Sequence, residues 1–305
     1  MSEVGARARV PVVGAKAAGE IRQRRAPKRP GRRTLVYAVL ILTSVAMIGP
    51  FYWMLATSFK PAADVFASPP KWIPNPWTLG NYRYIVKYLS FVRYSFNSVF
   101  VTGSIVLLNV LFDTAAAYAF AKLRFPGRNL LFFLLLVTLM VPFQVNLIPL
   151  FKIMVLLHDL NSRLGVSTYS GLILPGMIQV FGIFLMRQFL QSIPDEVLES
   201  ARVDGASEFR ILRSIVFPVA APGMATLAIF TFLGAWNDFL WPLIVINDDA
   251  HKTLTLGLVG LQAKNTINYG NEMAGTAFTA VPLILVFLLL QRRFIEGLTA
   301  GAVKG

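Results

Sequence analysis

The side chains that most often carry out chemistry are sparse in this 305-residue chain and stand far apart. Cysteine is absent, which excludes disulfides, thiolate nucleophiles and iron–sulfur ligation. His158 and His251 are the only histidines, and neither has a second histidine at a spacing that suits a metal site. A G-x-x-x-x-G-K-S/T phosphate loop and the motifs H-E-x-x-H and G-x-S-x-G are also absent. We therefore predict no catalytic residue, no metal site and no cofactor held by this chain itself.

Acidic side chains gather instead in residues 191–218, which hold five of the fifteen acids. Ser192 with Asp195 predicts a capping box, and Pro194 suits the first turn of a short helix. Gly205 is expected to end that helix in a left-handed conformation, and Ser207 to begin a second one. The segment therefore predicts a helix–glycine–helix element between two hydrophobic segments.

The second of these helices is expected to be amphipathic. Phe209, Leu212 and Ile215 share one face by their spacing, and Pro218 ends the element. A functional element that binds a partner is one interpretation of the whole segment. A simple amphipathic connector on the membrane surface is the other, and the residues alone favour neither.

Two further acids, Asp113 and Asp238, lie within long apolar runs. Acids in such positions usually face water or a partner, which suggests a polar translocation path that would include Trp236 and Asn237. The alternatives are structural. Asp113 could bond a neighbouring hydroxyl such as that of Thr138, and Asp238 could lie in solvent near the outer membrane interface.

The surrounding composition predicts a membrane protein, because 55% of the residues are hydrophobic and only 14% are charged. Six apolar runs are long enough, or nearly so, to cross the hydrocarbon core of a bilayer. The first is longer than the apolar part of a cleaved signal peptide, so we expect it to be retained as a span. The expected spans are 35–57, 95–121, 130–151, 171–186, 219–246 and 273–291.

The net charge of +14 is concentrated in residues 1–34, where ten Lys and Arg face only two acids. A soluble chain with this excess would suggest nucleic-acid binding. Here the segment predicts a disordered basic tail on the cytoplasmic side, close to anionic lipid. With both termini inside, twenty basic residues lie in cytoplasmic segments and nine in outer ones, as the positive-inside rule requires.

The segment ESARVDGA at 199–206, followed by IVFP at 215–218, resembles the E-A-A-x-x-x-G-(x)9-I-x-L-P signature. That signature marks the permease subunits of binding-protein-dependent ABC importers. Ser200 and Phe217 depart from the pattern, whereas Glu199, Gly205 and Pro218 keep its spacing. The D-G-A form is typical of the carbohydrate-uptake branch.

Three other segments resemble the maltose-type permeases of that branch. They are the C-terminal GLTAGAVKG at 297–305, the segment GAWNDFLWP at 234–242, and the outer-loop residues Trp72, Pro74, Thr78, Asn81 and Tyr82. The resemblance covers residues 35–305 and leaves the basic tail outside. It implies an all-α integral membrane protein of the type I, MetI-like permease fold, with six transmembrane helices. The implied organisation is a tail at 1–34, a permease domain at 35–291 and a cytoplasmic C-terminal tail at 292–305.

The resemblance also implies a role for the acidic segment, as a coupling helix that docks on a separate ATP-binding subunit. Phe209 and Leu212 would hold its second helix to the permease, and the C-terminal tail would extend toward the same ATPase. The residues implied to couple the two subunits are Glu199, Ala201, Asp204, Gly205, Ala206 and Pro218.

The implied partners are a dimer of ATP-binding subunits that bind the ATP, a second homologous permease and an extracytoplasmic sugar-binding protein, with no nucleic acid among them. The implied location is the bacterial plasma membrane. The rival hypothesis is a secondary transporter or channel that acts alone on a small polar solute, because proline-broken spans and intramembrane acids suit that class too. A membrane-embedded enzyme is disfavoured by the lack of histidines, cysteines and clustered acids at the interface.

Overall fold

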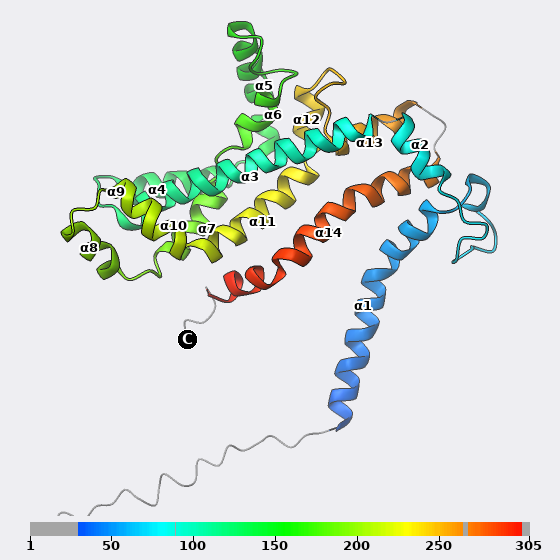
Figure 1. Cartoon of the computed structure of the whole chain (residues 1–305), viewed down its shortest axis with the longest axis horizontal. Helices are drawn as coiled ribbons and strands as arrows, with labels where there is room; N and C mark the ends of the chain where they lie inside the picture. The colour runs from blue at the N-terminus through cyan, green and yellow to red at the C-terminus, as the bar shows by residue number, and fades with distance from the viewer. Residues whose placement is uncertain (1–29, 89, 265–267, 301–305) are drawn as a thin grey trace, which may run out of the picture. The chain divides into compact units, whose positions relative to one another are not determined.

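A computed structural model describes the backbone of residues 30–88, 90–264 and 268–300, and their side chains except at 30–34, 88, 261–264 and 292–300. These residues form helices and loops without a strand (Figure 1). The chain divides into two units, 1–52 and 53–305, whose boundary falls inside the first helix. The elements are α1 (Pro30–Ser58), η1 (Ala62–Asp64), α2 (Gly80–Tyr88), α3 (Phe91–Lys122), α4 (Arg128–Thr138), α5 (Phe143–Leu160), α6 (Tyr169–Ile173), η2 (Leu174–Gly176), α7 (Val180–Leu190), α8 (Asp195–Val203), α9 (Glu208–Ile211), η3 (Leu212–Val216), α10 (Phe217–Val219), α11 (Ala221–Asn237), α12 (Leu240–Val245), α13 (Leu254–Lys264) and α14 (Tyr269–Ala300).

Four of the described helices, α1, α3, α5 and α14, are long and apolar enough to cross a membrane. Two bent pairs raise the number to six. Helices α6 and η2 join α7 at 44°, and the segment 208–219 joins α11 at 78°. The bends lie beside Pro175 and Pro222, whose missing amide hydrogens weaken the helix at those points. The prediction of six spans therefore holds when each bent pair is counted as one span.

The third expected span, residues 130–151, is divided between two helices. Helix α4 ends at Thr138, and α5 begins at Phe143 with Pro142 as its N-cap. Proline disfavours helical backbone in the residue before it, so the helix stops and restarts at this point. Pro149 is accommodated inside α5, and the span of sufficient length is 143–160 rather than 130–151.

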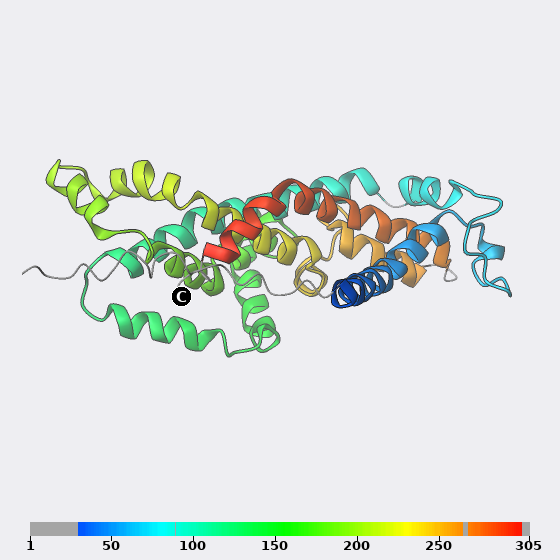
Figure 2. The same ribbon diagram turned by 90° about the horizontal axis from the view of Figure 1, so that it is seen from below.

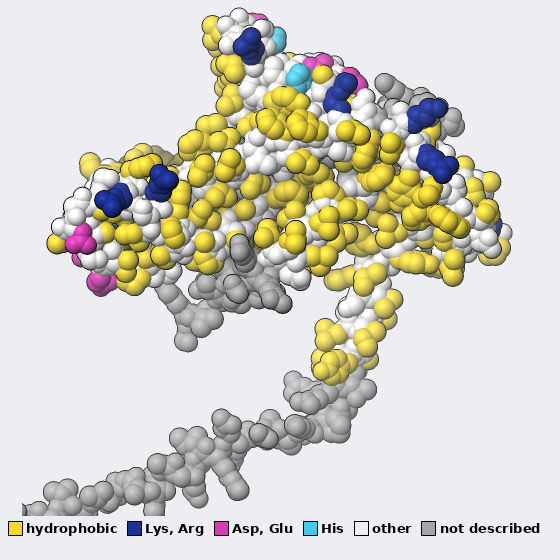
Figure 3. All heavy atoms as spheres, in the orientation of Figure 1, with side chains coloured by type: hydrophobic (Ala, Val, Ile, Leu, Met, Phe, Trp, Pro, Cys, Tyr) yellow, Lys and Arg dark blue, Asp and Glu magenta, His cyan; other side chains and the backbone are white. Residues whose placement is uncertain are grey.

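Within the second unit, α3 is the central helix. It packs against α7 and α11, and α11 packs in turn against α14. Figures 1 and 2 show these helices running side by side. Hydrophobic side chains cover much of the face seen in Figure 3. Large exposed hydrophobic residues occur along α3, α4, α5 and α14, as expected where lipid or another protein covers the helices.

Buried polar side chains on α3 support the break in the α6–α7 span. Asn109 donates a hydrogen bond from Nδ2 to the carbonyl of Gly176 at 2.6 Å. Asp113 accepts one at Oδ1 from the backbone N–H of Gln179 at 3.1 Å. These two contacts satisfy backbone groups on either side of the break, which hydrocarbon could not do. The interrupted helix is therefore stabilised by its neighbour.

The outer-loop motif around Asn81 holds α2 against the end of α1. Asn81 Nδ2 donates to the carbonyls of Ser58 and Lys60, both at 2.8 Å. The hydroxyl of Tyr82 lies 2.8 Å from that of Ser58. Lys60 is fully buried with its Nζ 3.9 Å from the centre of the Trp53 ring, and burial lowers the pKa of its ammonium group. The sequence motif at 78–82 therefore has a structural role in this chain.

The two predicted tails fall partly outside the described residues. Residues 1–29 and 301–305 lie outside the described residues. Of the basic tail predicted at 1–34, the structure describes only the helical backbone of 30–34. Within the C-terminal tail implied at 292–305, the backbone of 292–300 is helical. Helix α14 continues to Ala300, because the residues after 291 keep the hydrogen-bonded helical backbone of the span.

Candidate functional site

The 191–218 loop folds as the predicted helix–glycine–helix element. Helix α8 ends at Val203, and Gly205 follows with a φ of +78°. The N–H of Gly205 bonds the carbonyl of Arg202, and the N–H of Ala206 bonds that of Ala201, both at 3.0 Å. This pair of contacts is a Schellman motif, which favours glycine at the left-handed position. The turn between the two helices is therefore fixed by its backbone.

The second helix begins as predicted but then changes its period. The Ser207 hydroxyl caps α9 by accepting a hydrogen bond from the N–H of Arg210 at 3.3 Å. Residues 212–216 then form a π-helical turn. Ile211 and Val216, five residues apart as in a π-helix, are the fully buried members of this face. Leu212 packs against the same cluster, as expected.

Two expectations for this loop are wrong. Phe209 does not hold the second helix to the core, because its side chain is 72% exposed and Ile211 takes that place. Ser192 does not cap α8. Its hydroxyl donates instead to the carbonyl of Phe189 at 2.6 Å, and Pro194 occupies the N-cap without a side-chain bond. Serine commonly bonds a nearby backbone carbonyl in this way.

The outward face of the loop combines acids with apolar side chains. Glu199 and Asp204 are exposed, as are Gly205 and Pro218. Val203 is 87% exposed beside them. Ala201 and Ala206 are half-buried and pack toward the core. The six residues predicted to couple the subunits are thus divided between an exposed surface and the packing beneath it.

Side chains from α3 secure the loop, and the sequence prediction did not include them. Lys122 Nζ lies 2.5 Å from the Asp195 carboxylate and donates to the carbonyl of Ile193 at 2.6 Å. Tyr118, one turn earlier, contacts Glu208. The sequence does contain a pattern that could have indicated these contacts. Two polar side chains, one of them a lysine, lie four residues apart at the end of an apolar helix, and a loop later in the chain is rich in acids that a lysine could pair with.

Acidification tests the contact between Lys122 and Asp195. The hydrogen bond from Lys122, and its charge, hold the pKa of Asp195 below its ordinary value. A carboxyl whose pKa is lower in the folded than in the unfolded state stabilises the fold at pH values above the unfolded-state pKa. That stabilisation is lost as the pH falls through the folded-state pKa. Asp195→Asn should lower the free energy of unfolding at pH 7 by less than about 1 kcal/mol for so exposed a pair, which would appear as a slightly lower melting temperature. The difference from wild type should shrink toward zero as both are acidified below pH 4 in detergent, and a difference that grows on acidification would contradict the contact.

A cavity of about 350 Å³ lies between α3, the α6–α7 break, α5 and the end of α11. Asp238, Gln179 and Gly234 line it together with the aromatic rings of Phe143 and Trp241. Trp241 is fixed by a 2.9 Å hydrogen bond from Nε1 to the carbonyl of Gly171. The cavity therefore combines one acid and one amide with aromatic and aliphatic walls, a composition typical of sites for small polar molecules.

Of the four residues predicted for a translocation path, the structure places one, Asp238, in this cavity. Trp236 is buried, stacks on Phe232 and donates to the carbonyl of Thr279 at 3.0 Å. Asn237 is exposed and bonds the preceding turn of its own helix at Leu233.

Asp113 is fully buried, and its backbone contact at Gln179 places it behind the cavity wall. Its Oδ2 lies where a side chain at position 182 would begin, so Gly182 is needed for this close approach. Thr138 bonds the carbonyl of Leu135. The sequence prediction missed Gln179 and Phe143, which line the cavity.

The described side chains contain no group of three His, Asp or Glu residues that could hold a metal ion. Long apolar helices, proline-broken spans, a cavity between the helices that contains an acid and an amide, and a structured surface loop together indicate a multi-pass membrane transport protein. The profile of the family described as "Binding-protein-dependent transport system inner membrane component" matches residues 113–297. The chain belongs to this family, and it is a permease subunit rather than an enzyme.

Curated relatives agree along most of the chain. An arabinooligosaccharides transport system permease protein of Halalkalibacterium halodurans is 37% identical, over 84% of this chain and 91% of the relative. A diacetylchitobiose uptake system permease protein of Streptomyces coelicolor is 35% identical, over 88% of both chains. An sn-glycerol-3-phosphate transport system permease protein of Escherichia coli is 34% identical, over 88% of this chain and 97% of the relative.

Solved structures show the same fold. A chain of a bacterial ABC transporter involved in the import of the acidic polysaccharide alginate superposes with a TM-score of 0.74. It is 24% identical, and the match covers 87% of this chain and 98% of the other. A chain of the alginate transporter in complex with a pentasaccharide-bound periplasmic protein gives a TM-score of 0.62 at 16% identity, over 85% of this chain and 93% of the other. The fold is thus that of a type I ABC importer permease.

Proposed function

We propose that this chain is one of two permease subunits in an ATP-driven carbohydrate importer of the bacterial plasma membrane. The 191–218 loop would couple it to a separate ATP-binding subunit on the cytoplasmic side. The observation that carries the proposal is the exposed face of this loop, which is held on a fixed turn and presents Glu199, Asp204 and the large apolar side chain of Val203 to the outside. A transporter that acts alone has no need for such a surface.

The partner at this surface would be recognised by charge and by apolar contact together. Val203 and Phe209 expose large hydrophobic side chains, and Glu199 lies one turn from Val203 on the same face of α8. Glu199 forms no ion pair or hydrogen bond with the described residues. A carboxylate in this position suits a charge-assisted hydrogen bond from an arginine or a backbone N–H of the ATP-binding subunit.

The cavity favours a neutral carbohydrate as the solute. Aromatic rings at Phe143 and Trp241 offer apolar faces, and Gln179 and Asp238 offer hydrogen-bonding groups. The lining holds one acid and no Lys or Arg, so a phosphate would meet repulsion without a compensating positive charge. Two of the three relatives described above are named for oligosaccharides, which agrees with this choice.

The rest of the transport system would complete the path. The second, homologous permease would cover exposed apolar faces of this chain and form the other half of the pore. An extracytoplasmic binding protein would deliver the sugar. The excess of Lys and Arg in the predicted inner segments supports an orientation in which both termini and the 191–218 loop lie in the cytoplasm.

The solute class is tested by uptake in a strain that lacks this chain. Labelled arabino-oligosaccharide, diacetylchitobiose and glycerol 3-phosphate would each be supplied, with the full-length chain restored as the control. We expect loss of uptake of an oligosaccharide, recovered on restoration. Loss of glycerol 3-phosphate uptake alone, or unchanged uptake of all three, would contradict a carbohydrate importer.

Filling the cavity should block transport without unfolding the chain. Gly234 lines the cavity, and a Cβ at this position meets no atom within 4 Å. Gly234→Trp should therefore reduce uptake by at least about tenfold, since the ring would occupy space needed by the solute. Gly234→Ala should support normal uptake, because an alanine adds little volume and is favoured in a helix by about 1 kcal/mol. Equal uptake by the two variants, at equal amounts in the membrane, would exclude this cavity from the path.

A further inference from the structure

The C-terminal end of α3 carries two polar side chains that contact the 191–218 loop. Tyr118 and Lys122 are four residues apart and so lie on the same face of the helix. Tyr118 is only 3% exposed, although it stands near the end of the helix. The pair secures the loop at both of its short helices, because Lys122 bonds Asp195 at the start of α8 while Tyr118 contacts Glu208 at the start of α9.

Glu208 is bound from two sides. The Tyr118 hydroxyl donates to its Oε2 at 2.5 Å, and Arg202 donates from Nε to its Oε1 at 2.8 Å. Arg202 Nη2 also lies 3.4 Å from the Tyr118 hydroxyl, which closes the set into a triangle. Arg202 is in the last turn of α8 and Glu208 is the first residue of α9. The three side chains therefore join α8, α9 and α3 across the Gly205 turn.

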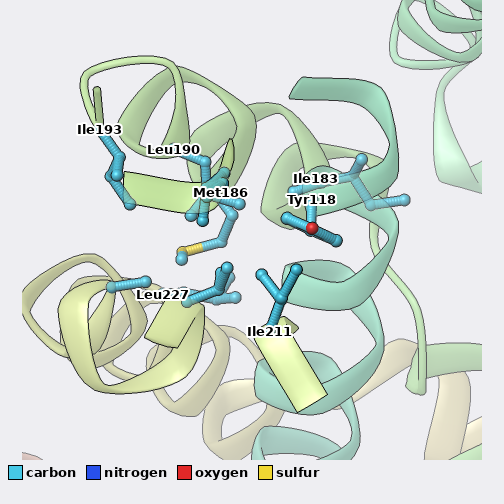
Figure 4. Close-up of a cluster of buried hydrophobic side chains, with 11 residues drawn as sticks. Tyr118, Ile183, Met186, Leu190, Ile193, Ile211 and Leu227 are labelled. Atoms are coloured by element: carbon cyan, nitrogen blue, oxygen red, sulfur yellow. The ribbon is translucent and has the colours of Figure 1, made fainter. Parts of the chain in front are cut away.

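Apolar packing lies directly beneath these polar contacts. Tyr118, Leu198 and Ile211 belong to one buried cluster with residues of α7 and α11. Figure 4 shows the Tyr118 ring close to Ile211, with Met186 and Leu227 nearby. Apolar contacts hold the loop against α3 but are not directional, so they permit some sliding. The hydrogen bonds at Glu208 are directional and fix the rotation and register of the loop on α3.

Helix α3 leads from this contact to the wall of the cavity. Asp113 is five residues before Tyr118, which is about 7.5 Å along an α-helix. Asp113 in turn bonds the backbone of Gln179, which lines the cavity. A displacement of the loop that keeps the Glu208 contacts intact must move this end of α3. Helix α3 therefore connects the loop to the cavity, through the Tyr118 contact at one point and the Asp113 contact at the other.

We propose that Tyr118, Arg202 and Glu208 form a polar clasp that transmits displacement of the 191–218 loop to α3 and so to the cavity. The three are positioning residues, since they act by bonding α8, α9 and α3 to one another: Tyr118 is buried, whereas the side chains of Arg202 and Glu208 remain 34% and 46% exposed. The proposal rests on the proposed function, in which an ATP-binding subunit displaces the loop. It adds which side chains convert that displacement into movement of a membrane helix.

The test measures the amount of sugar imported per ATP hydrolysed in vesicles that contain the complete transporter. Tyr118→Phe removes only the hydroxyl and keeps the ring in the apolar cluster, and Glu208→Gln keeps the size of the side chain. We expect each variant to lower the ratio by about fivefold or more, the lower range for coupling between sites. A role confined to assembly would reduce uptake and ATP hydrolysis together and leave the ratio unchanged.

Tyr94→Phe is the matched control. Tyr94 is also a buried tyrosine of α3, and it donates to the Asp249 carboxylate at 2.6 Å, but near the other end of the helix. It should keep the wild-type ratio. The double variant of Tyr118→Phe and Glu208→Gln should lose no more than Glu208→Gln alone, because that change already weakens the contact that Tyr118→Phe removes.

An unchanged ratio in both single variants, with the ATP-binding subunit still bound, would overturn the clasp. A drop of the sugar-to-ATP ratio in Tyr94→Phe as large as that in Tyr118→Phe would also overturn the clasp. Failure of the wild-type chain to bind an ATP-binding subunit would instead overturn the proposed function, so the two failures are distinguishable.

Discussion

Glu199→Arg should abolish or strongly reduce sugar uptake while the chain still folds and inserts. Glu199 is exposed on α8 and has no partner among the described residues, so reversal of its charge should change stability by no more than about 0.5 kcal/mol. Its proposed partner lies on the ATP-binding subunit. Loss of one member of an interfacial charge-assisted contact typically costs about 2–5 kcal/mol, which corresponds to at least about thirtyfold weaker binding.

Uptake by whole cells and the amount of ATP-binding subunit that purifies with the chain would be measured together. Arg163→Glu supplies the matched control, because Arg163 is exposed in the loop between α5 and α6, far along the chain from the 191–218 loop. This control should transport normally. Normal uptake by Glu199→Arg, at a wild-type amount in the membrane, would remove Glu199 from the coupling surface.

Gly205→Pro should have an effect at least as large, by changing the backbone rather than the surface. Proline cannot adopt the φ of +78° found at Gly205, and it lacks the N–H that bonds the Arg202 carbonyl. The Schellman turn would be lost, and α9 would no longer be directed back against α3. Uptake should fall below detection while the long apolar helices still insert.

Gly205→Asn tests whether transport needs the left-handed turn at position 205 or the glycine itself. A Cβ at Gly205 meets no atom within 4 Å, so an added side chain would suffer only the backbone penalty of about 1–2 kcal/mol. Asparagine tolerates the left-handed region better than most residues, and this variant should keep most of the uptake. Similar uptake in the asparagine and proline variants would show that the geometry of the turn does not matter for transport.

The loop was largely predictable because its signals are local. Gly205 and Ser207 encode a helix end and a helix start through their own backbone and side chain, and the structure confirms both. The orientation of the second helix was less accessible. A π-helical turn at 212–216 shifts the buried positions to Ile211 and Val216, whereas a regular period of 3.6 places Phe209 on the inner face.

The polar path could not be predicted in the same way, since it depends on tertiary contacts. Trp236 and Asp238 are two residues apart in the sequence, yet one packs against α14 and the other lines the cavity. Asp113 was correctly singled out as an unusual acid, but only the fold shows that it holds Gln179. Hydropathy likewise located the third span but not the break before Pro142, because both helices that flank it are apolar.

The absence of cysteine makes the central claim directly testable, because a single introduced thiol would be unique. Glu199→Cys would be cross-linked in native membranes to nearby lysines or thiols, with Arg163→Cys, in the exposed loop after α5, as the control. Both variants would also be labelled with a membrane-impermeant thiol reagent on each side. The account predicts that position 199 reacts from the cytoplasmic side and cross-links to a polypeptide that is itself labelled by a photoreactive ATP analogue. Position 163 should do neither. Labelling of position 199 from the outer side, or active sugar uptake without any ATP-binding polypeptide cross-linked there, would contradict it.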